Sequence, residues 1–228
     1  RTLIPDSKEA LDEIKNLLGN LESLLQGIYL INELSPKTVD KLLAYGEILS
    51  SSIIARAMYA QGLDAVRKDS RDLITTNDKH TKAGVNYKVT NSQIEYYFTK
   101  AKQKITVLPG FIASTANGDT TTLGRGGSDL SAVAIAKFFK TDSCEIYTDV
   151  DGVLTTDPSM NKNAKKIEKI SYEEMLEMAS TGAKVLQTRS VELAMKNNLT
   201  LQVLSSLTNS KGTYIVNEDK LIEKEIVS

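Results

Sequence analysis

The stretch TTTLGRGGSD, residues Thr120 to Asp129, decides the expected fold and site of this chain, and an apolar, helix-like run from Leu130 to Phe139 follows it directly. It combines hydroxyl groups, three glycines, one arginine and one carboxylate. Glycines let backbone N–H groups approach a ligand closely, and the N-terminus of a helix attracts anions. Arg125 can bind a carboxylate or a phosphate through two parallel hydrogen bonds. The stretch therefore predicts a phosphate site of the kind that phosphoryl-transfer enzymes use.

Two familiar phosphate-binding motifs do not match this stretch. The Walker A loop ends in Gly-Lys followed by Ser or Thr, and that ending is absent. The dinucleotide-binding pattern G-x-G-x-x-G cannot be placed on residues 124–129 either. The stretch therefore indicates a phosphate site of another kind, with a purely structural turn as the alternative.

The composition is that of an ordinary globular chain. Of its 228 residues, 41% are hydrophobic and 25% are charged, which suits one large domain or two small ones. The net charge of -1 gives no general attraction to nucleic acid or to a membrane surface, and no apolar run approaches the length of a membrane span. We therefore expect no nucleic-acid partner and no membrane partner.

The cysteine and histidine content restricts both the compartment and the chemistry. Cys144 is the single cysteine and His80 the single histidine. No disulfide can form within the chain, which fits a reducing compartment, and we expect a cytoplasmic protein. A Cys/His zinc site is excluded, and we assign no metal-ligating residue. A Cys–His catalytic pair is disfavoured, because Cys144 falls in an expected strand and His80 in a polar loop.

Helical and strand patterns alternate along the chain. Apolar residues at helical spacing cover residues 6–62, with a fresh start at Ser35-Pro36, where serine can cap a helix that begins with proline. Further helices are expected at residues 91–102, 130–139, 171–182 and 187–197, strands at 63–67, 104–108, 143–147, 199–204 and 212–216, and a polar loop at 68–86. This alternation predicts an α/β fold with a mainly parallel sheet and helices on both faces.

Ligands of such sheets bind at the carboxyl ends of the strands. The loops that follow Leu108, Tyr147 and Leu204 should therefore share one edge. The first leads to the glycine-rich stretch, and the second holds the segment Thr148-Asp149-Val150-Asp151-Gly152. That segment is either a loop that contacts a nucleotide or a plain Asp-Gly turn.

Two charged residues elsewhere are further candidates. Glu47 interrupts an apolar helical face, and Lys184 follows Gly182-Ala183. Glu47 is either a solvated glutamate or an acceptor for a substrate ammonium group. Lys184 is either a lysine at a helix end or a contact to nucleotide phosphates. The residues alone leave both choices open.

Together these segments resemble the aspartate kinases of the amino-acid kinase superfamily. The resemblance runs from about Leu34 to Tyr214, which is most of the chain. Besides residues 120–129, it is carried by ELSP, YGE, PGFI, YTDVDGV, TTDP, ISYEEM and GAKVL, at residues 33–36, 45–47, 109–112, 147–153, 155–158, 170–175 and 182–186. So many matches in the same order argue against coincidence.

The resemblance implies a three-layer αβα sandwich around a mainly parallel sheet. It implies transfer of the γ-phosphoryl group of ATP, with Mg²⁺, to the β-carboxylate of L-aspartate, which gives 4-phospho-L-aspartate and ADP. This reaction is the first step toward lysine, threonine and methionine. We expect L-aspartate and ATP as ligands, and a homo-oligomer. In the full protein, the resemblance implies C-terminal regulatory domains and, in some members, a fused homoserine dehydrogenase.

The resemblance also assigns roles to residues. Glu47 would meet the amino group of aspartate, Arg125 would bind a substrate carboxylate and take part in catalysis, and Ser128 would donate a nearby hydroxyl. Asp129 would be the catalytic aspartate that organises the site. The nucleotide contacts would come from Gly126, Gly127, Thr148, Asp149, Lys184 and Val185.

The chain departs from the family pattern at several positions. The Lys-Phe-Gly-Gly motif of the family's first strand does not occur, so we expect an N-terminally incomplete catalytic domain over residues 1–217, then a tail or linker over 218–228. Leu154 and Ser159 stand where many relatives have tyrosine and arginine, and Gln187-Thr188 where many have His-Pro. Two alternatives remain. One is a superfamily kinase that acts on glutamate, acetylglutamate or uridylate, and the other is a ligand-binding fragment without catalysis.

Overall fold

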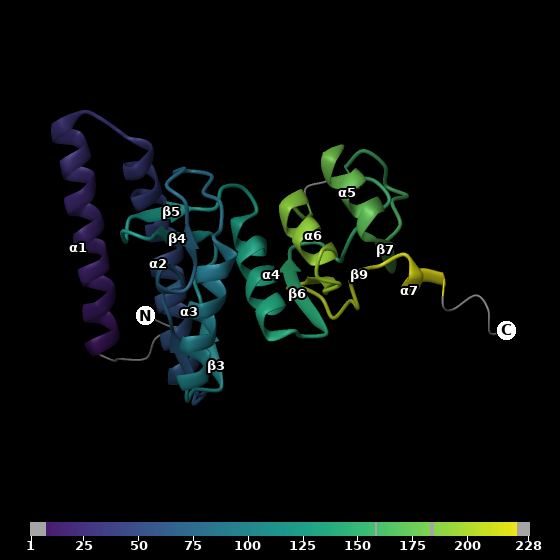
Figure 1. Cartoon of the computed structure of the whole chain (residues 1–228), viewed down its shortest axis with the longest axis horizontal. Helices are drawn as coiled ribbons and strands as arrows, with labels where there is room; N and C mark the ends of the chain where they lie inside the picture. Colours follow the sequence, from purple (N-terminus) through teal and green to yellow (C-terminus); the bar gives the residue numbers. More distant parts are fainter. Residues whose placement is uncertain (1–7, 158, 183–184, 223–228) are drawn as a thin grey trace. The chain divides into compact units, whose positions relative to one another are not determined.

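The computed structural model describes residues 8–157, 159–182 and 185–222. Contacts within the chain divide it into two compact units, residues 1–128 and 129–228, termed the first and the second unit (Figure 1). The glycine-rich stretch spans the boundary, because Ser128 closes the first unit and Asp129 opens the second.

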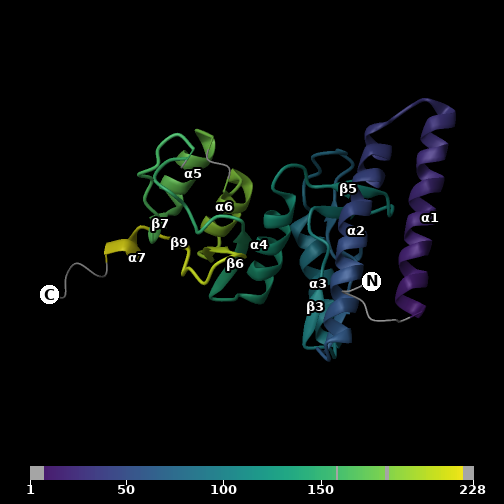
Figure 2. The same ribbon diagram turned by 180° about the vertical axis from the view of Figure 1, so that it is seen from behind.

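Two long helices open the first unit, α1 (Lys8–Ile31) and α2 (Pro36–Ala60), and they lie side by side in both views (Figures 1 and 2). The Ser35 side chain caps α2 by accepting a hydrogen bond from the Thr38 amide at 3.2 Å, and Pro36 follows in the first turn. Such a cap stabilises a helix by about 1 kcal/mol. The helix start predicted at Ser35-Pro36 is confirmed.

The strands of the first unit form two small sheets. In one sheet, β1 (Ala65–Arg67) runs parallel to β3 (Ile105–Val107). In the other, β2 (Thr75–Thr76) runs parallel to β4 (Ile112–Thr115), and β4 pairs antiparallel with β5 (Thr120–Thr122). A 3-10 turn, η1 (Ser70–Asp72), precedes β2, and helix α3 (Tyr87–Lys100) precedes β3.

The core of the first unit joins α2 to the hairpin of β4 and β5. Ala44 and Ile48, one turn apart on α2, pack against Ile112 of β4, and Leu17 and Phe111 cover this cluster. Burial of each large apolar side chain contributes about 1.5–3 kcal/mol. The packing holds one face of α2 against the hairpin that leads into the glycine-rich turn.

The second unit contains a four-stranded sheet with the order β6-β8-β9-β7. β6 (Ser143–Thr148) is parallel to β8 (Thr200–Ser205), β7 (Lys169–Ser171) is parallel to β9 (Thr213–Val216), and β8 and β9 are antiparallel. The helices are α4 (Gly127–Phe139), which begins two residues before the boundary, α5 (Tyr172–Ser180), α6 (Thr188–Met195) and α7 (Asp219–Ile222).

Helix α5 begins with the capping box that its sequence predicts. The Glu174 amide donates to Ser171 Oγ at 3.1 Å, and the Ser171 amide donates to the Glu174 carboxylate at 3.0 Å. Tyr172 lies buried beside this cap, and its hydroxyl donates to the Leu199 carbonyl at 2.6 Å. Burial, with the charge of Glu173 nearby, raises the pKa of Tyr172 to about 12, so this phenol stays a neutral donor.

The predicted α/β class and the mainly parallel pairing of strands are confirmed. Four strands were missed. The expected loop at residues 68–86 contains β2, the expected loop before the glycines contains β4 and β5, and β7 precedes α5. β2 and β5 consist of threonine, which is polar, yet these residues are buried because their hydroxyls find partners inside the fold.

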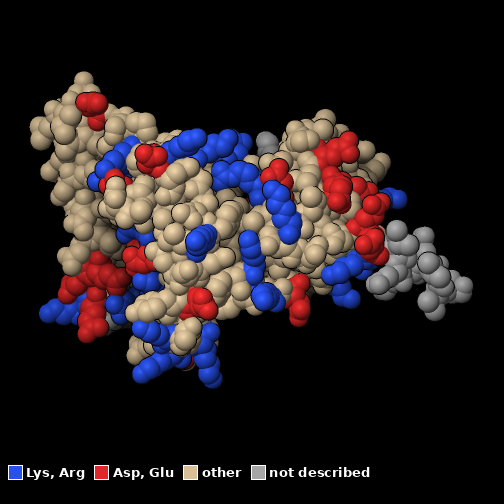
Figure 3. Space-filling model, in the orientation of Figure 1, with Lys and Arg blue, Asp and Glu red and all other residues tan. Residues whose placement is uncertain are grey.

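Charges of both signs are mixed on the face of the molecule drawn in Figure 3. On the face drawn in Figure 3, Lys and Arg side chains and Asp and Glu side chains both occur over each unit. In the part of the chain that the structure describes, no helix combines the length and the apolar character that crossing a membrane requires.

Candidate functional site

The three threonines that open the glycine-rich stretch serve the fold. Thr120 Oγ1 accepts a hydrogen bond from Arg71 at 3.2 Å, Thr121 Oγ1 lies 2.7 Å from Thr76 Oγ1, and Thr122 Oγ1 donates to the Asp40 carboxylate at 2.6 Å. All three residues are buried. These three hydroxyls therefore bond within the fold and hold β5 in place.

The turn after β5 presents a cation. Gly124 and Gly126 adopt positive φ angles of 73° and 69°, which glycine tolerates and other residues rarely adopt. The Gly127 amide donates to the Gly124 carbonyl at 2.9 Å and closes the turn. Arg125 at its tip is exposed and forms no ion pair with any residue that the structure describes. Its guanidinium is thus open to solvent, and its role in binding a substrate carboxylate stays a prediction.

Close packing explains the glycines on either side of the turn. A Cβ placed on Gly127 would lie 2.9 Å from Leu123 Cβ and 3.0 Å from the Phe111 ring. A Cβ on Gly110 would lie 2.9 Å from Ser128 Cα. Only residues without side chains let the start of α4 approach the segment before β4 so closely, and this contact places Ser128.

The packing at Gly127 predicts a large effect of a small change. We expect Gly127→Ala to lower the free energy of unfolding by about 1–3 kcal/mol, because the added methyl group overpacks the contact with Leu123 and Phe111. Gly19→Ala in α1 is the matched control, since a Cβ there meets nothing within 4 Å, and we expect it to stabilise by about 0.5–1 kcal/mol. Urea unfolding of both variants measures the two opposite signs, and an unchanged Gly127→Ala protein would contradict the packing argument.

Glu47 lies in the same unit as the turn. It is half-buried on α2, and burial raises the pKa of its carboxyl group. The helix packs against β5, the strand that leads to Arg125. A partly desolvated carboxylate attracts a cation more strongly than an exposed one does, which suits the predicted role as acceptor for an ammonium group. That role stays a prediction.

Asp129 stands in the first turn of α4, in the second unit. The helix N-terminus favours its charge, but burial acts more strongly and raises the pKa of the carboxyl group. Burial together with the nearby charges of Asp129 and Glu145 raises the pKa of Cys144 to about 11. The Cys144 thiol in β6 is therefore protonated near neutral pH, which agrees with the prediction that it is no nucleophile.

The second unit contains a cavity of about 600 Å³ that is lined by three of the six predicted nucleotide contacts. Thr148, Asp149 and Val185 line it, as do Thr155, Thr156 and Asp157 of the polar segment after β6. Thr148 Oγ1 donates to Asp149 at 3.1 Å. Lys184 lies outside the described residues, and Gly126 and Gly127 belong to the first unit.

Two of the three loops expected to share one edge of the sheet lie together near this cavity. β6 and β8 end next to each other, since the Ser206 amide donates to the Thr148 carbonyl at 2.8 Å. The predicted meeting of the loops after Tyr147 and Leu204 is thereby confirmed, whereas Leu108 belongs to the first unit. Asp151 accepts a hydrogen bond from Thr208, whereas Asp149 and Gly152 line the cavity.

Several lining residues were missed by sequence reasoning. Met160 lies in the loop after Asp157, and Met178 and Thr181 lie at the end of α5. Nothing in their local sequence distinguishes them from core or surface residues. Leu154, one of the departures from the family pattern, also lines the cavity. Ser159, another departure, donates its hydroxyl to Asp157 at 2.6 Å.

The cavity offers carboxylates that suit a magnesium nucleotide. Mg²⁺ at nucleotide sites is bound through one or two carboxylates together with the phosphates. Asp149 and Asp157 both line the cavity, so its residues fit this demand. Among the described residues, no three His, Cys, Asp or Glu side chains come together to form a metal cluster.

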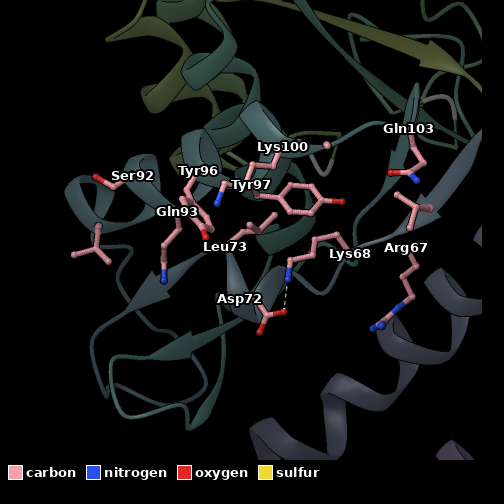
Figure 4. Close-up of a pocket in the computed structure, with 13 residues that line it drawn as sticks. Arg67, Lys68, Asp72, Leu73, Ser92, Gln93, Tyr96, Tyr97, Lys100 and Gln103 are labelled. Carbon is pink, nitrogen blue, oxygen red and sulfur yellow. Dashed lines mark hydrogen bonds and ion pairs between the residues drawn. The ribbon is translucent and has the colours of Figure 1, made fainter.

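A different cavity of about 660 Å³ lies in the first unit, between α3 and the segment from β1 to η1 (Figure 4). Tyr96 and Tyr97 line it, and Lys68 pairs with Asp72 at 2.5 Å within it. It contains none of the predicted site residues, and its lysines are engaged, because Lys100 also lies 3.8 Å above the Tyr96 ring.

The sequence of this chain is similar to those of known proteins. Residues 7–205 match the amino acid kinase family. The aspartokinase of Helicobacter pylori (strain 26695) is 41% identical over 206 residues, which cover 90% of this chain and 50% of that protein. The aspartate kinase of Pseudomonas putida (strain KT2440) is 41% identical over 195 residues, 85% of this chain and 47% of that protein.

A solved structure gives the same result. The crystal structure of E. coli aspartokinase III in complex with aspartate and ADP (R-state) superposes with a TM-score of 0.85 at 32% identity, over 90% of this chain and 46% of that chain. The chain thus spans about half the length of the relatives it matches. Since a single family accounts for residues 7–205 and its solved members share this fold, the chain belongs to the amino acid kinase family.

Proposed function

We propose that this chain is the catalytic part of an aspartate kinase, which transfers the γ-phosphoryl group of Mg-ATP to the β-carboxylate of L-aspartate. The observation that carries the proposal is the similarity to aspartokinases, at 41% identity over 85–90% of the chain. The cavity at the end of β6 and the exposed Arg125 supply sites for a nucleotide and for an anionic acceptor.

The proposed roles fall into two sets. In the first unit, Glu47 binds the amino group of aspartate, Arg125 binds a carboxylate and Ser128 donates a hydroxyl. In the second unit, Thr148, Asp149 and Val185 contact the nucleotide, together with Lys184. The fused organisation and the homo-oligomer expected from the resemblance, and the place of the reaction before lysine, threonine and methionine, belong to the same proposal.

The chemistry requires little beyond positioning and charge neutralisation. The β-carboxylate of aspartate is ionised near neutral pH, so no general base is needed. Two anions must nevertheless meet, and arginine, lysine and backbone amides of Gly126 and Gly127 lower the repulsion between them. Asp149 and Asp157 would hold Mg²⁺, which would supply further positive charge. Asp129 organises the groups around the transferred phosphoryl group.

The direct test is ADP release by this chain with Mg-ATP and L-aspartate, with L-glutamate and uridylate as alternative acceptors. Release with aspartate alone supports the proposal, and release with another acceptor identifies a different kinase of the superfamily. If no ADP is released, calorimetric titration with ATP and with aspartate measures whether the chain binds either ligand. Binding without turnover would identify a fragment that lacks catalysis, and no binding of aspartate would overturn the substrate assignment.

The nucleotide half makes its own prediction. We expect Asp149→Ala to raise the KM for ATP by roughly tenfold, the effect of losing one hydrogen bond to the ligand, while the KM for aspartate changes less than twofold. Asp219→Ala on the exposed start of α7 is the matched control. Initial rates at varied ATP and aspartate measure both constants, and an equal rise in the two would remove Asp149 from the nucleotide site.

A further inference from the structure

One carboxylate in the first unit is fully buried, and both of its oxygens accept hydrogen bonds. Asp40 of α2 is 0% exposed. Its Oδ2 accepts hydrogen bonds from His80 Nδ1 at 2.8 Å and from the Thr81 amide at 2.9 Å. Its Oδ1 accepts from Thr122 Oγ1 at 2.6 Å and from the same amide at 3.0 Å. A carboxylate is stable in a buried place only when hydrogen bonds of this kind compensate for the lost water. We call Asp40, His80, Thr81 and Thr122 the Asp40 cluster.

The cluster connects the two segments that carry the predicted acceptor site. Asp40 and Glu47 are seven residues apart on α2, which places them on the same face, about two turns or 10 Å along the axis. Thr122 ends β5, and Arg125 follows three residues later. The bond from Thr122 to Asp40 therefore ties the helix of Glu47 to the strand that leads to Arg125.

A second route runs from Asp40 to the same turn. Thr81 has a φ of 68°, an unfavourable conformation for a β-branched residue, and both oxygens of Asp40 hold its amide there. The Thr81 carbonyl lies against the turn, since a Cβ on Gly124 would be 3.1 Å from that oxygen. Asp40 thus restricts the position of the turn in two ways. It acts through Thr122 of β5, and it acts through Thr81 in the loop that contacts Gly124.

We propose that Asp40 is a positioning residue for the acceptor side of the site, where its carboxylate sets the place of the Arg125 turn relative to Glu47, with His80 as the donor that completes the cluster. The proposal rests on the proposed function for its link to aspartate. A carboxylate suits this place, because each partner of Asp40 can donate a hydrogen bond to it. An asparagine at position 40 would point its own N–H groups at one of these donors. His80 contributes through its Nδ1 donor alone, so asparagine, whose amide nitrogen occupies a similar place, should replace it.

The test compares variants that remove single bonds of the cluster. Thr122→Val and Asp40→Asn break it, His80→Leu removes one donor, and His80→Asn and Thr122→Ser keep a donor at each place. Thr121→Val is the matched control, because it deletes a neighbouring buried hydroxyl that bonds to Thr76 on β2. Hydrogen exchange is followed at the Leu123 and Gly127 amides, which donate to the Phe111 and Gly124 carbonyls.

We expect Thr122→Val and Asp40→Asn to speed exchange at Leu123 and Gly127 at least about tenfold more than exchange in β8 of the second unit. The KM for aspartate should rise about tenfold while the KM for ATP stays within twofold, and His80→Asn and Thr122→Ser should behave like the unchanged chain. Uniform faster exchange throughout the first unit, or equal rises in both KM values, would make Asp40 a purely structural residue and overturn the proposal.

If the unchanged chain neither binds nor phosphorylates aspartate, the proposed function fails by itself, and the exchange comparison still decides whether Asp40 positions the turn. Should Asp40→Asn fail to fold, the pair Thr122→Val and Thr122→Ser decides alone.

Discussion

Asp129→Asn should reduce kcat about 100- to 1,000-fold and leave the chain at least as stable as before. The catalytic loss is expected because the carboxylate organises charged groups around the transferred phosphoryl group, and the amide cannot replace its charge. The KM values should change far less than kcat, since the effect acts in the transition state. ADP release at saturating aspartate and ATP measures the loss, and turnover near that of the unchanged chain would remove Asp129 from the catalytic machinery.

The stability of this variant follows from the pKa of Asp129. Burial raises that pKa in the folded state, so the ionised carboxylate is less favourable in the folded chain than in the unfolded one. Its unfavourable contribution appears as the pH rises through the folded-state pKa and is absent below the ordinary carboxyl pKa of about 3.9, where both states bind the proton. We expect Asp129→Asn to raise the Tm near pH 7 and to lose this advantage at acidic pH.

A matched substitution separates this effect from a general effect of charge. Asp142 precedes β6 in the same unit and is exposed, so Asp142→Asn should change neither kcat nor the pH dependence of the Tm. Thermal unfolding of both variants between pH 3 and pH 8, roughly the range that spans the carboxyl titration, makes the comparison. A destabilised Asp129→Asn protein at neutral pH would show that the helix N-terminus, and not burial, dominates at this carboxylate.

Arg125→Ala should raise the KM for aspartate roughly 10- to 150-fold, the loss that corresponds to about 1.5–3 kcal/mol for a charge-assisted, two-pronged contact. The KM for ATP should hardly change. Arg125 is exposed and pairs with no described residue, so its removal should alter the free energy of unfolding by less than about 0.5 kcal/mol. Initial rates at varied aspartate give the constant.

Two further variants sharpen this result. Arg125→Lys keeps the charge but loses the fork-shaped geometry, and we expect an intermediate KM for aspartate. Lys88→Ala, an exposed cation on α3, serves as the control for net charge and should leave the constant unchanged. An unaltered KM in Arg125→Ala would show that another group binds the substrate carboxylate.

Local signals in the sequence were reliable where they act within one turn. Ser35 and Pro36 start α2, the capping box of Ser171 and Glu174 starts α5, and the strand predicted at residues 143–147 forms β6. The family resemblance named Thr148, Asp149 and Val185, and the cavity in the second unit contains all three. The α/β class followed from the alternation of these elements.

The threonines of the glycine-rich stretch mark the limit of such reasoning. Their composition suggested a ligand site, yet Thr122 bonds to a residue 82 positions away, and its neighbours bond to Arg71 and Thr76. A polar strand looks like a loop in sequence, because nothing local tells whether its hydroxyls will meet water or buried partners. Asp40 was overlooked for the same reason.

The sequence by itself thus determined the family, the helix starts, the α/β class and the arginine between glycines. The helix starts depend on residue type and on neighbours within about four positions, which is the range of caps, turns and helical periodicity. The family followed from many motif matches in the same order along the chain. Only the tertiary structure decided that the threonine hydroxyls are internal, that Asp40 is buried with His80, and that Met160, Met178 and Thr181 share a cavity with Asp149. These outcomes depend on burial and on hydrogen bonds between distant segments, and such contacts arise only when the chain has folded.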